Sequence, residues 1–308
     1  MVQQITIGTR GSQLALWQAN WVKSQILRWN PELEIVVRVI STKGDRVLNV
    51  SLPKLGEQGK GLFTKELEEA ILNRQVDLAV HSLKDLPTER PAGLQISAFC
   101  EREDARDALV AREGIESFDD LPQRGKVGTS SLRRQAQLLA KRGDLMILPV
   151  RGNVDTRLRK LDDGEFDAVV LAAAGLHRLG YSQRITQHFD KDFIVPAVGQ
   201  GALAIEARED DDTVNGIVQS VDHKPTRLSC TAERALLKGL GGGCLVPIAG
   251  HAEIESGLMR LTGLVSNTDG SEALRGDRSG PAVDAERLGQ QLADELLSRG
   301  ARRILARG

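Results

Sequence analysis

An order of segments that occurs twice constrains the fold of this chain more than any other feature. The run IGTRGSQLALWQ (residues 7–18) resembles VGTSSLRRQAQL (residues 127–138), and VDLAV (residues 76–80) resembles FDAVV (residues 166–170). In both copies a short strand-like run precedes a stretch whose apolar residues recur with helical spacing. Strands that alternate with amphipathic helices are typical of α/β domains. The sequence therefore predicts two related α/β domains.

The remaining segments predict a third domain. We expect the first domain to span residues 1–100 and about 200–219, because PAVGQGALAIEAR (residues 196–208) contains an apolar, strand-like segment that can cross back. The second domain is expected at about 105–195. From about 222 to 308, a helix is followed by alternating apolar and polar segments and then by a terminal helix, which predicts a small α+β domain.

Composition restricts the class of ligand. Aromatic residues make up 3% of the 308 residues, which argues against a carbohydrate or single-stranded nucleic-acid platform built on ring stacking. The net charge of −1 gives no overall field that would attract nucleic acid or a membrane surface. Any anion site must therefore come from local clusters of arginine and lysine.

Cysteine usage and the N-terminal sequence indicate the compartment. Cys100, Cys230 and Cys244 are too few and too scattered for a disulfide framework or a CxxC metal knuckle, and no HExxH or EF-hand motif occurs, so we expect no metal. The first residues read as a strand rather than a signal peptide, and no apolar run approaches membrane-spanning length. We expect a reduced, cytoplasmic, monomeric protein that binds neither membranes nor nucleic acid.

Cationic and hydroxyl residues recur where predicted strands end. In open α/β sheets, ligands bind beyond the carboxyl ends of the strands. Any one of these arginines could be a solvated surface charge, but five or more at successive strand ends indicate a ligand with several carboxylate or phosphate groups. The residues are Arg10, Ser12, Ser82, Lys84, Thr129, Ser130, Ser131, Arg133, Arg134, Arg151, Arg157 and Arg178.

Arg133 and Arg134 stand out because they lie in the first turn of a predicted helix. A helix N-terminus attracts anions, and a cation there costs about 0.3–1 kcal/mol. Two arginines in this unfavourable position, directly after the hydroxyls of residues 129–131, indicate that an anion binds there.

Asp85 is the one carboxylate that we find in the strand-end motifs, in HSLKDLP (residues 81–87). It could form a structural ion pair with Lys84 or a neighbouring arginine. It could also stabilise a developing cation or transfer a proton. His81 is open to two interpretations as well, as a supporting hydrogen-bonding group or as a base.

Cys244 lies in GLGGGCLVPIAG (residues 239–250), after three glycines and before Pro247. Glycines remove side chains beside the sulfur and allow a bulky group to approach, and proline stiffens the exit from the loop. Cys244 is therefore a candidate for covalent chemistry.

Eight motifs, in order along residues 5 to about 255, resemble the porphobilinogen deaminase (hydroxymethylbilane synthase) family. They are GTRGSQLALWQ, KGLFTKELE, DLAVHSLKDLPT, VGTSSLRRQAQL, RGNVDTRL, AAAGLHRLG, PAVGQGALAIE and ERALLKGLGGGCLVPIAG. The resemblance implies two α/β domains similar to the lobes of type II periplasmic binding proteins, plus an α+β domain. It also implies an enzyme of tetrapyrrole biosynthesis that joins four porphobilinogen molecules head to tail, releases ammonia and yields linear hydroxymethylbilane.

The resemblance assigns roles to the residues named above. It implies a dipyrromethane cofactor attached to Cys244 by a thioether, with Asp85 as the catalytic aspartate. The implied cofactor-binding residues are Ser82, Lys84, Thr129, Ser130, Ser131, Arg133, Arg134, Arg157 and Gln200. The implied residues for substrate and the growing oligopyrrole are Arg10, Ser12, Arg151, Arg157 and Arg178. The implied lid over the cleft includes Lys54, Lys60 and Phe63.

Two other classes of function were weighed. A non-catalytic, two-lobed anion-binding protein would fit the fold, but it has no need of a glycine-framed cysteine. A cysteine hydrolase would use Cys244 as its nucleophile and needs a histidine partner, and only His251 is close in sequence.

Overall fold

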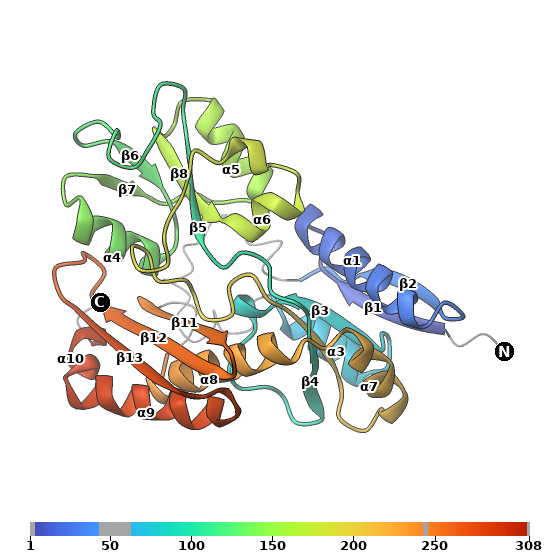
Figure 1. Ribbon diagram of the computed structural model, residues 1–308. Helices are drawn as coiled ribbons and strands as arrows, with labels where there is room; N and C mark the ends of the chain where they lie inside the picture. Colours follow the sequence, from blue (N-terminus) through green and yellow to red (C-terminus); the bar gives the residue numbers. More distant parts are fainter. Residues whose placement is uncertain (1–3, 43–62, 243–245, 307–308) are drawn as a thin grey trace. The chain divides into compact units, whose positions relative to one another are not determined.

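The structure is a computed structural model that describes residues 4–42, 63–242 and 246–306 (Figure 1). The chain divides into two compact units. The first unit comprises Met1–Glu103 and Ala202–Arg227, and the second comprises Asp104–Gly201 and Leu228–Gly308. The three-domain boundaries expected from the sequence stay a prediction.

The first unit contains a five-stranded sheet in the order β2-β1-β3-β10-β4. Strands β1, β2 and β3 are parallel, whereas β10 is antiparallel to both of its neighbours. The strands are β1 (Gln4–Thr9), β2 (Glu34–Val39), β3 (Leu78–Ser82), β4 (Leu94–Phe99) and β10 (Leu203–Arg208). The helices are α1 (Gln13–Trp29), α3 (Lys65–Leu72) and α7 (Asp212–Val218). Every residue of β10 is buried, as expected of a strand inside a covered sheet.

The second unit repeats this arrangement in the order β7-β6-β8-β5-β9. Strand β6 is parallel to β7 and β8, and β5 is antiparallel to β8 and β9. The strands are β5 (Asp107–Ala111), β6 (Lys126–Gly128), β7 (Met146–Leu148), β8 (Ala168–Ala172) and β9 (Gln187–His188). The helices are α4 (Leu132–Lys141), α5 (Val154–Asp162) and α6 (Ala173–Arg178). The two sheets share one strand order, as the internal repeat predicts.

The second unit also contains a three-stranded antiparallel sheet in the order β11-β12-β13. Its apolar face packs with α8 and α9 around Leu236, Leu261, Leu292 and Leu296, which are all fully buried. The elements are α8 (Lys224–Gly239), β11 (Ile248–Glu255), β12 (Leu258–Ser266), β13 (Ala273–Pro281), α9 (Ala285–Ser298) and α10 (Ala301–Leu305). The predicted fold class, two α/β domains with a smaller α+β domain, is therefore confirmed.

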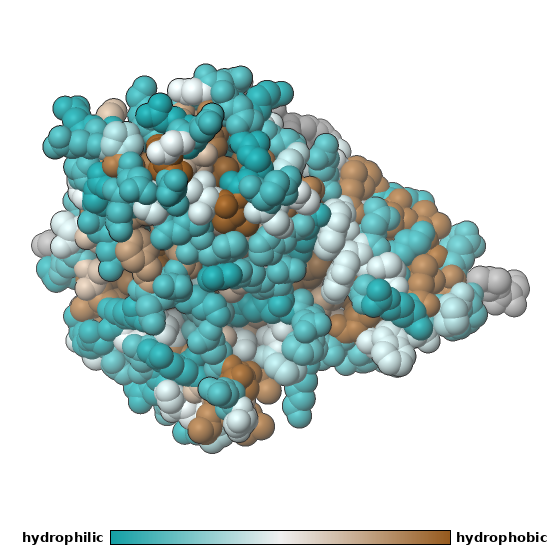
Figure 2. All heavy atoms as spheres, turned by 45° about the horizontal axis from the view of Figure 1, so that its top comes forward, coloured by the Kyte–Doolittle hydropathy of each residue, from teal (hydrophilic) through white to brown (hydrophobic). Residues whose placement is uncertain are grey.

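The surface is mostly hydrophilic on the face that Figure 2 shows, with apolar side chains in scattered patches. Across residues 4–42, 63–242 and 246–306, none of the helices combines the length and the apolar character that a membrane span requires.

Candidate anion-binding active site

Leu83 anchors the turn that carries Asp85. Strand β3 ends at Ser82, and a 3-10 turn follows over Leu83–Asp85. Leu83 is buried, and its backbone N–H donates to the carbonyl oxygen of Ala202 at 3.0 Å. Lys84 is half-buried and Asp85 is exposed. The turn thus presents the Asp85 carboxylate to solvent from a fixed backbone.

His81 lies behind this turn rather than on it. The imidazole is buried, and Nε2 lies 3.1 Å from Oε2 of Glu206, a fully buried carboxylate on β10. Burial raises the pKa of the neighbouring Glu68 carboxyl, and the nearby Thr64 side chain opposes this shift. Of the two interpretations of His81, the geometry favours the supporting, hydrogen-bonding one. The sequence analysis missed Glu206, because nothing in the sequence pairs β10 with β3.

Three further candidates of the first unit have structural contacts of their own. Ser82 Oγ accepts a hydrogen bond from Nε2 of Gln18 at 2.9 Å. Ser12 caps α1, because its side-chain oxygen accepts from the backbone N–H of Ala15 at 3.3 Å. The guanidinium of Arg10 lies 4.2 Å from the centre of the Phe63 ring, a cation–π contact. The predicted substrate role of Arg10 and Ser12 stays a prediction.

The hydroxyls at residues 129–131 shape the start of α4. Ser131 caps the helix by accepting from the backbone N–H of Arg134 at 3.4 Å. Thr129 Oγ1 accepts from the backbone N–H of Ser131 at 3.2 Å. Ser130 Oγ donates to the carbonyl oxygen of Val150 at 2.8 Å. The predicted role of these residues in binding a cofactor remains a prediction.

Arg133 and Arg134 are buried against one carboxylate, that of Asp107. Nη1 of Arg133 lies 2.7 Å from Oδ2 of Asp107, and Nη2 of Arg134 lies 2.7 Å from Oδ1. Nε2 of Gln200 donates to the same Oδ1 at 2.9 Å. Burial alone would raise the pKa of Asp107, but the two guanidinium groups hold it well below its ordinary range.

Asp107 compensates the unfavourable positive charge that the sequence predicts at the N-terminus of α4. Arg133 and Arg134 do lie in the first turn of α4, but Asp107 offsets their charge, so they are not unopposed cations at a helix N-terminus. Two guanidinium groups facing one carboxylate still leave an excess of positive charge. In addition, Nε of Arg133 is buried and has no hydrogen-bond partner among the described residues. A bound carboxylate would satisfy that donor.

The pattern of residues that follow predicted strands does not include Asp107, because Asp107 begins a strand. Strand β5 runs antiparallel to β8, and its first residue, Asp107, pairs with Ala172, the last residue of β8. The beginning of β5 therefore lies at the same edge of the sheet as the ends of β6 and β8. Strand direction is the missing information, and the local sequence does not contain it.

Three more arginines follow strands β7 and β8 of this sheet. Arg151, Arg157 and Arg178 are all half-buried. Nε of Arg157 donates to the carbonyl oxygen of Gly152 at 2.9 Å, and Nη2 of Arg178 donates to that of Gly201 at 2.7 Å. The second unit thus gathers five of the predicted arginines at one edge of its sheet.

Cys244, Lys54 and Lys60 lie outside the described residues, so the structure does not place them. The glycines beside Cys244 have a packing role. A Cβ atom on Gly239 would lie 2.6 Å from Cβ of Ala293, and one on Gly242 would lie 2.4 Å from Cδ1 of Ile248. Close packing of α8 against α9 therefore requires Gly239, whereas a side chain on Gly242 would displace the end of the Ile248 side chain.

Comparison with known proteins identifies the family. Residues 5–216 match the model of the porphobilinogen deaminase dipyrromethane cofactor binding domain, and residues 227–298 match that of the porphobilinogen deaminase C-terminal domain. A relative from Pelobacter propionicus, named porphobilinogen deaminase, is 53% identical over 98% of this chain and 96% of its own length. A second, from Geobacter metallireducens and with the same name, is 49% identical over 99% of this chain and 94% of its own length.

Among solved structures, the methionine binding protein MetQ is similar with 15% identity and a TM-score of 0.46, over 71% of this chain and 89% of that protein. A likeness this distant supports no assignment. The family models, however, cover most of the chain, and the relatives are about half identical over nearly its whole length. The chain belongs to the porphobilinogen deaminase family.

Proposed function

We propose that this chain is a transferase that deaminates four porphobilinogen molecules and joins them head to tail into linear hydroxymethylbilane. The observation that carries the proposal is the match of residues 5–216 to the cofactor-binding domain of the family. The relatives that share the name match this chain over nearly their full lengths.

A dipyrromethane cofactor, attached to Cys244 through a thioether, would supply the terminal pyrrole carbon from which the product grows. The residues of the second unit fit such a group, which carries several carboxylates. The Asp107 cluster has excess positive charge, and the buried Nε of Arg133 requires an acceptor. Arginine binds carboxylates in a planar, two-pronged geometry that lysine lacks. In this proposal Ser82, Lys84, Thr129, Ser130, Ser131, Arg133, Arg134, Arg157 and Gln200 hold the cofactor.

Asp85 is the proposed catalytic residue. Its carboxylate is exposed at the end of a turn that the buried Leu83 fixes, so it can approach a bound substrate without reorganisation of the backbone. A fixed carboxylate stabilises positive charge that develops on a pyrrole nitrogen as ammonia leaves. The same group can accept a proton once the new carbon–carbon bond has formed.

Four arginines and Ser12 are proposed to bind the acetate and propionate groups of the substrate. They are Arg10, Ser12, Arg151, Arg157 and Arg178. Lys54 and Lys60, with Phe63, are proposed to form a lid. Phe63 already contacts the Arg10 guanidinium, which would couple the lid to the substrate site. We further propose a monomeric, cytoplasmic enzyme with three domains.

The test of this proposal is turnover of porphobilinogen by the purified protein. Ammonia and linear hydroxymethylbilane should appear in a ratio of four to one. Stoichiometric binding of porphobilinogen without release of ammonia would contradict the proposal and would favour a non-catalytic anion-binding protein.

A further inference from the structure

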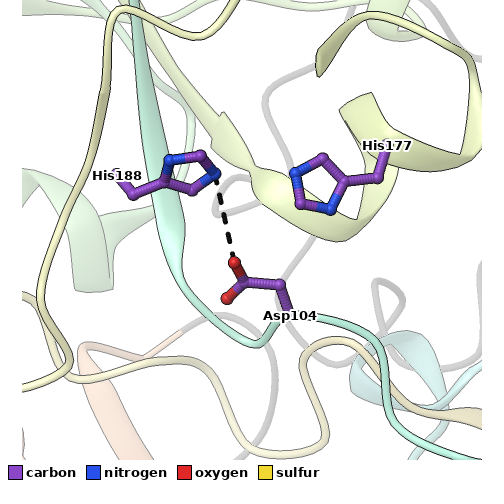
Figure 3. Close-up of side chains that lie close together, drawn as sticks. All are labelled: Asp104, His177 and His188. Carbon is purple, nitrogen blue, oxygen red and sulfur yellow. Dashed lines mark ion pairs between the residues drawn. The ribbon is translucent and has the colours of Figure 1, made fainter.

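Three side chains that the proposed function does not use converge in the second unit (Figure 3). They are Asp104, just before β5, His177 on α6 and His188 on β9. One potential ligand atom of each lies within 4.8 Å of the other two. Figure 3 shows the two imidazole rings on either side of a common space, with the Asp104 carboxylate pointing into it from below.

His188 provides an independent indication that this space takes a ligand. Its Nε2 atom is buried and has no hydrogen-bond partner among the described residues. The same atom lies 4.0 Å from Oδ2 of Asp104, too far for a hydrogen bond. The backbone of His188 is fixed, because it pairs with Ala108 of β5. The long ion pair with Asp104 leaves this buried nitrogen without a hydrogen bond, which is costly, and a metal ion between the nitrogen and the carboxylate would remove that cost.

Arg106 both supports and opposes such a site. Its Nε donates to Oδ1 of Asp104 at 3.0 Å, its Nη2 lies 2.7 Å from Oδ2, and its backbone N–H donates to Oδ1 at 2.9 Å. Hydrogen bonds of this kind orient carboxylates that bind metals. The guanidinium charge, in contrast, repels a divalent cation at this distance. Arg106 should therefore weaken metal binding without displacing the carboxylate.

We propose that Asp104, His177 and His188 bind one divalent transition-metal ion of the zinc or cobalt class. Two imidazoles and one carboxylate suit these metals, whereas magnesium and calcium prefer oxygen ligands alone. Ligands of a tetrahedral zinc ion lie ~3.3 Å apart, so atoms that lie within 4.8 Å of one another must approach by at most ~1.5 Å, which small side-chain rotations allow. The fourth position is left for water. The ion would link the segment before β5 to α6 and β9, independently of the proposed reaction.

The test is cobalt binding to the holoenzyme after treatment with a chelator. Equilibrium dialysis and elemental analysis should give one cobalt ion per chain, with the visible absorption of a four-coordinate ion. His177→Ala and His188→Ala should each weaken the affinity at least about tenfold. The matched control is His223→Ala, since His223 contacts Thr226 in the first unit and lies outside the cluster. Its cobalt affinity should equal that of the wild type.

Two further variants keep the test decisive. His188→Gln retains most of the side-chain volume, so it reports on the ligand even if His188→Ala is poorly folded, and it should also lose affinity. Arg106→Gln should bind cobalt more tightly, because the backbone N–H still orients Asp104 while the competing charge is gone. Unchanged affinity in Arg106→Gln would contradict coordination by Asp104. Equal cobalt binding by the wild type, His177→Ala and His188→Gln would overturn the site.

Discussion

Oδ2 of Asp107 lies 2.7 Å from Nη1 of Arg133 in a part of the second unit from which solvent is excluded. The other carboxylate oxygen binds Arg134, so one acid holds both arginines at the edge of the sheet. A carboxylate this deeply buried remains ionised only because both cations face it. The arrangement fixes two guanidinium groups in a buried, charged cluster, and the proposed function assigns both groups to the cofactor.

Removing the Asp107 charge should therefore destabilise the protein as well as impair cofactor binding. Asp107→Asn leaves two buried cations without their counter-ion, and we expect a loss of about 3–5 kcal/mol in the free energy of unfolding in urea. Asp210→Asn is the matched control, because Asp210 forms an exposed ion pair with Arg74 and should cost less than about 1 kcal/mol. A loss below about 1 kcal/mol in Asp107→Asn would contradict this account of the cluster.

Substitutions of two arginines that differ in burial should distinguish an effect on stability from an effect on cofactor binding. Arg133→Gln should lower both the free energy of unfolding and the fraction of protein that carries the cofactor, because Arg133 is buried against Asp107. Arg157→Gln should reduce the cofactor fraction and leave stability within about 1 kcal/mol of the wild type, because Arg157 is half-buried. Urea unfolding and intact mass measure the two effects. Equal losses of stability in both variants would show that burial does not distinguish them.

Asp85→Ala should lose activity without losing stability. The side chain is exposed, so we expect a change of less than about 0.5 kcal/mol in the free energy of unfolding. Turnover of porphobilinogen should fall by about 10²–10⁴-fold, the usual contribution of a positioned acid or base. Steady-state rates and thermal unfolding are the measurements. Activity within about threefold of the wild type would remove Asp85 from the mechanism.

Glu253 should contribute to the acid sensitivity of the second unit. The neighbouring His251 imidazole, and then the Lys191 ammonium group, lower the pKa of Glu253 from 4.5 to about 2. A lowered pKa contributes stability above the unfolded value, and this contribution is lost as the pH falls through the folded value. The wild type should therefore be more stable than Glu253→Gln at neutral pH, with the difference shrinking between pH 4.5 and about 2. In a Lys191→Gln background, the difference in stability between the protein that retains Glu253 and its Glu253→Gln variant should be smaller. A difference that does not change with pH would contradict the interaction of Glu253 with His251 and Lys191.

The repeated strand–helix order and the strand-end arginines could be predicted from the sequence, because both are local patterns. Asp107 and Glu206 could not be predicted in this way. Asp107 begins β5 and Glu206 lies within β10, and both strands are antiparallel, so each residue meets its partners only because of the order of strands in the sheet. The grouping of Asp104, His177 and His188 also escaped prediction, because the motif patterns of metal sites require short spacings. The burial of Arg133 and Arg134 could not be predicted either, because their counter-ion, Asp107, is 26 and 27 residues away in the sequence.

The glycine run before Cys244 shows how one local pattern can have two causes. The sequence analysis assigned the glycines to the approach of a bulky group. The structure adds that Gly239 has no room for a side chain against Ala293, and that a side chain on Gly242 would displace the end of the Ile248 side chain. The proposed attachment of the cofactor at Cys244 therefore rests on the resemblance to the family and not on the glycines.

The most direct test of the proposed function is the intact mass of the purified, denatured protein. The wild type should exceed the mass of its chain by one dipyrromethane, and Cys230→Ser, which alters a buried thiol, should keep that increment. Cys244→Ser should have the mass of the bare chain and no turnover. A fully active wild type at the bare chain mass, or an increment that persists in Cys244→Ser, would contradict covalent attachment at Cys244.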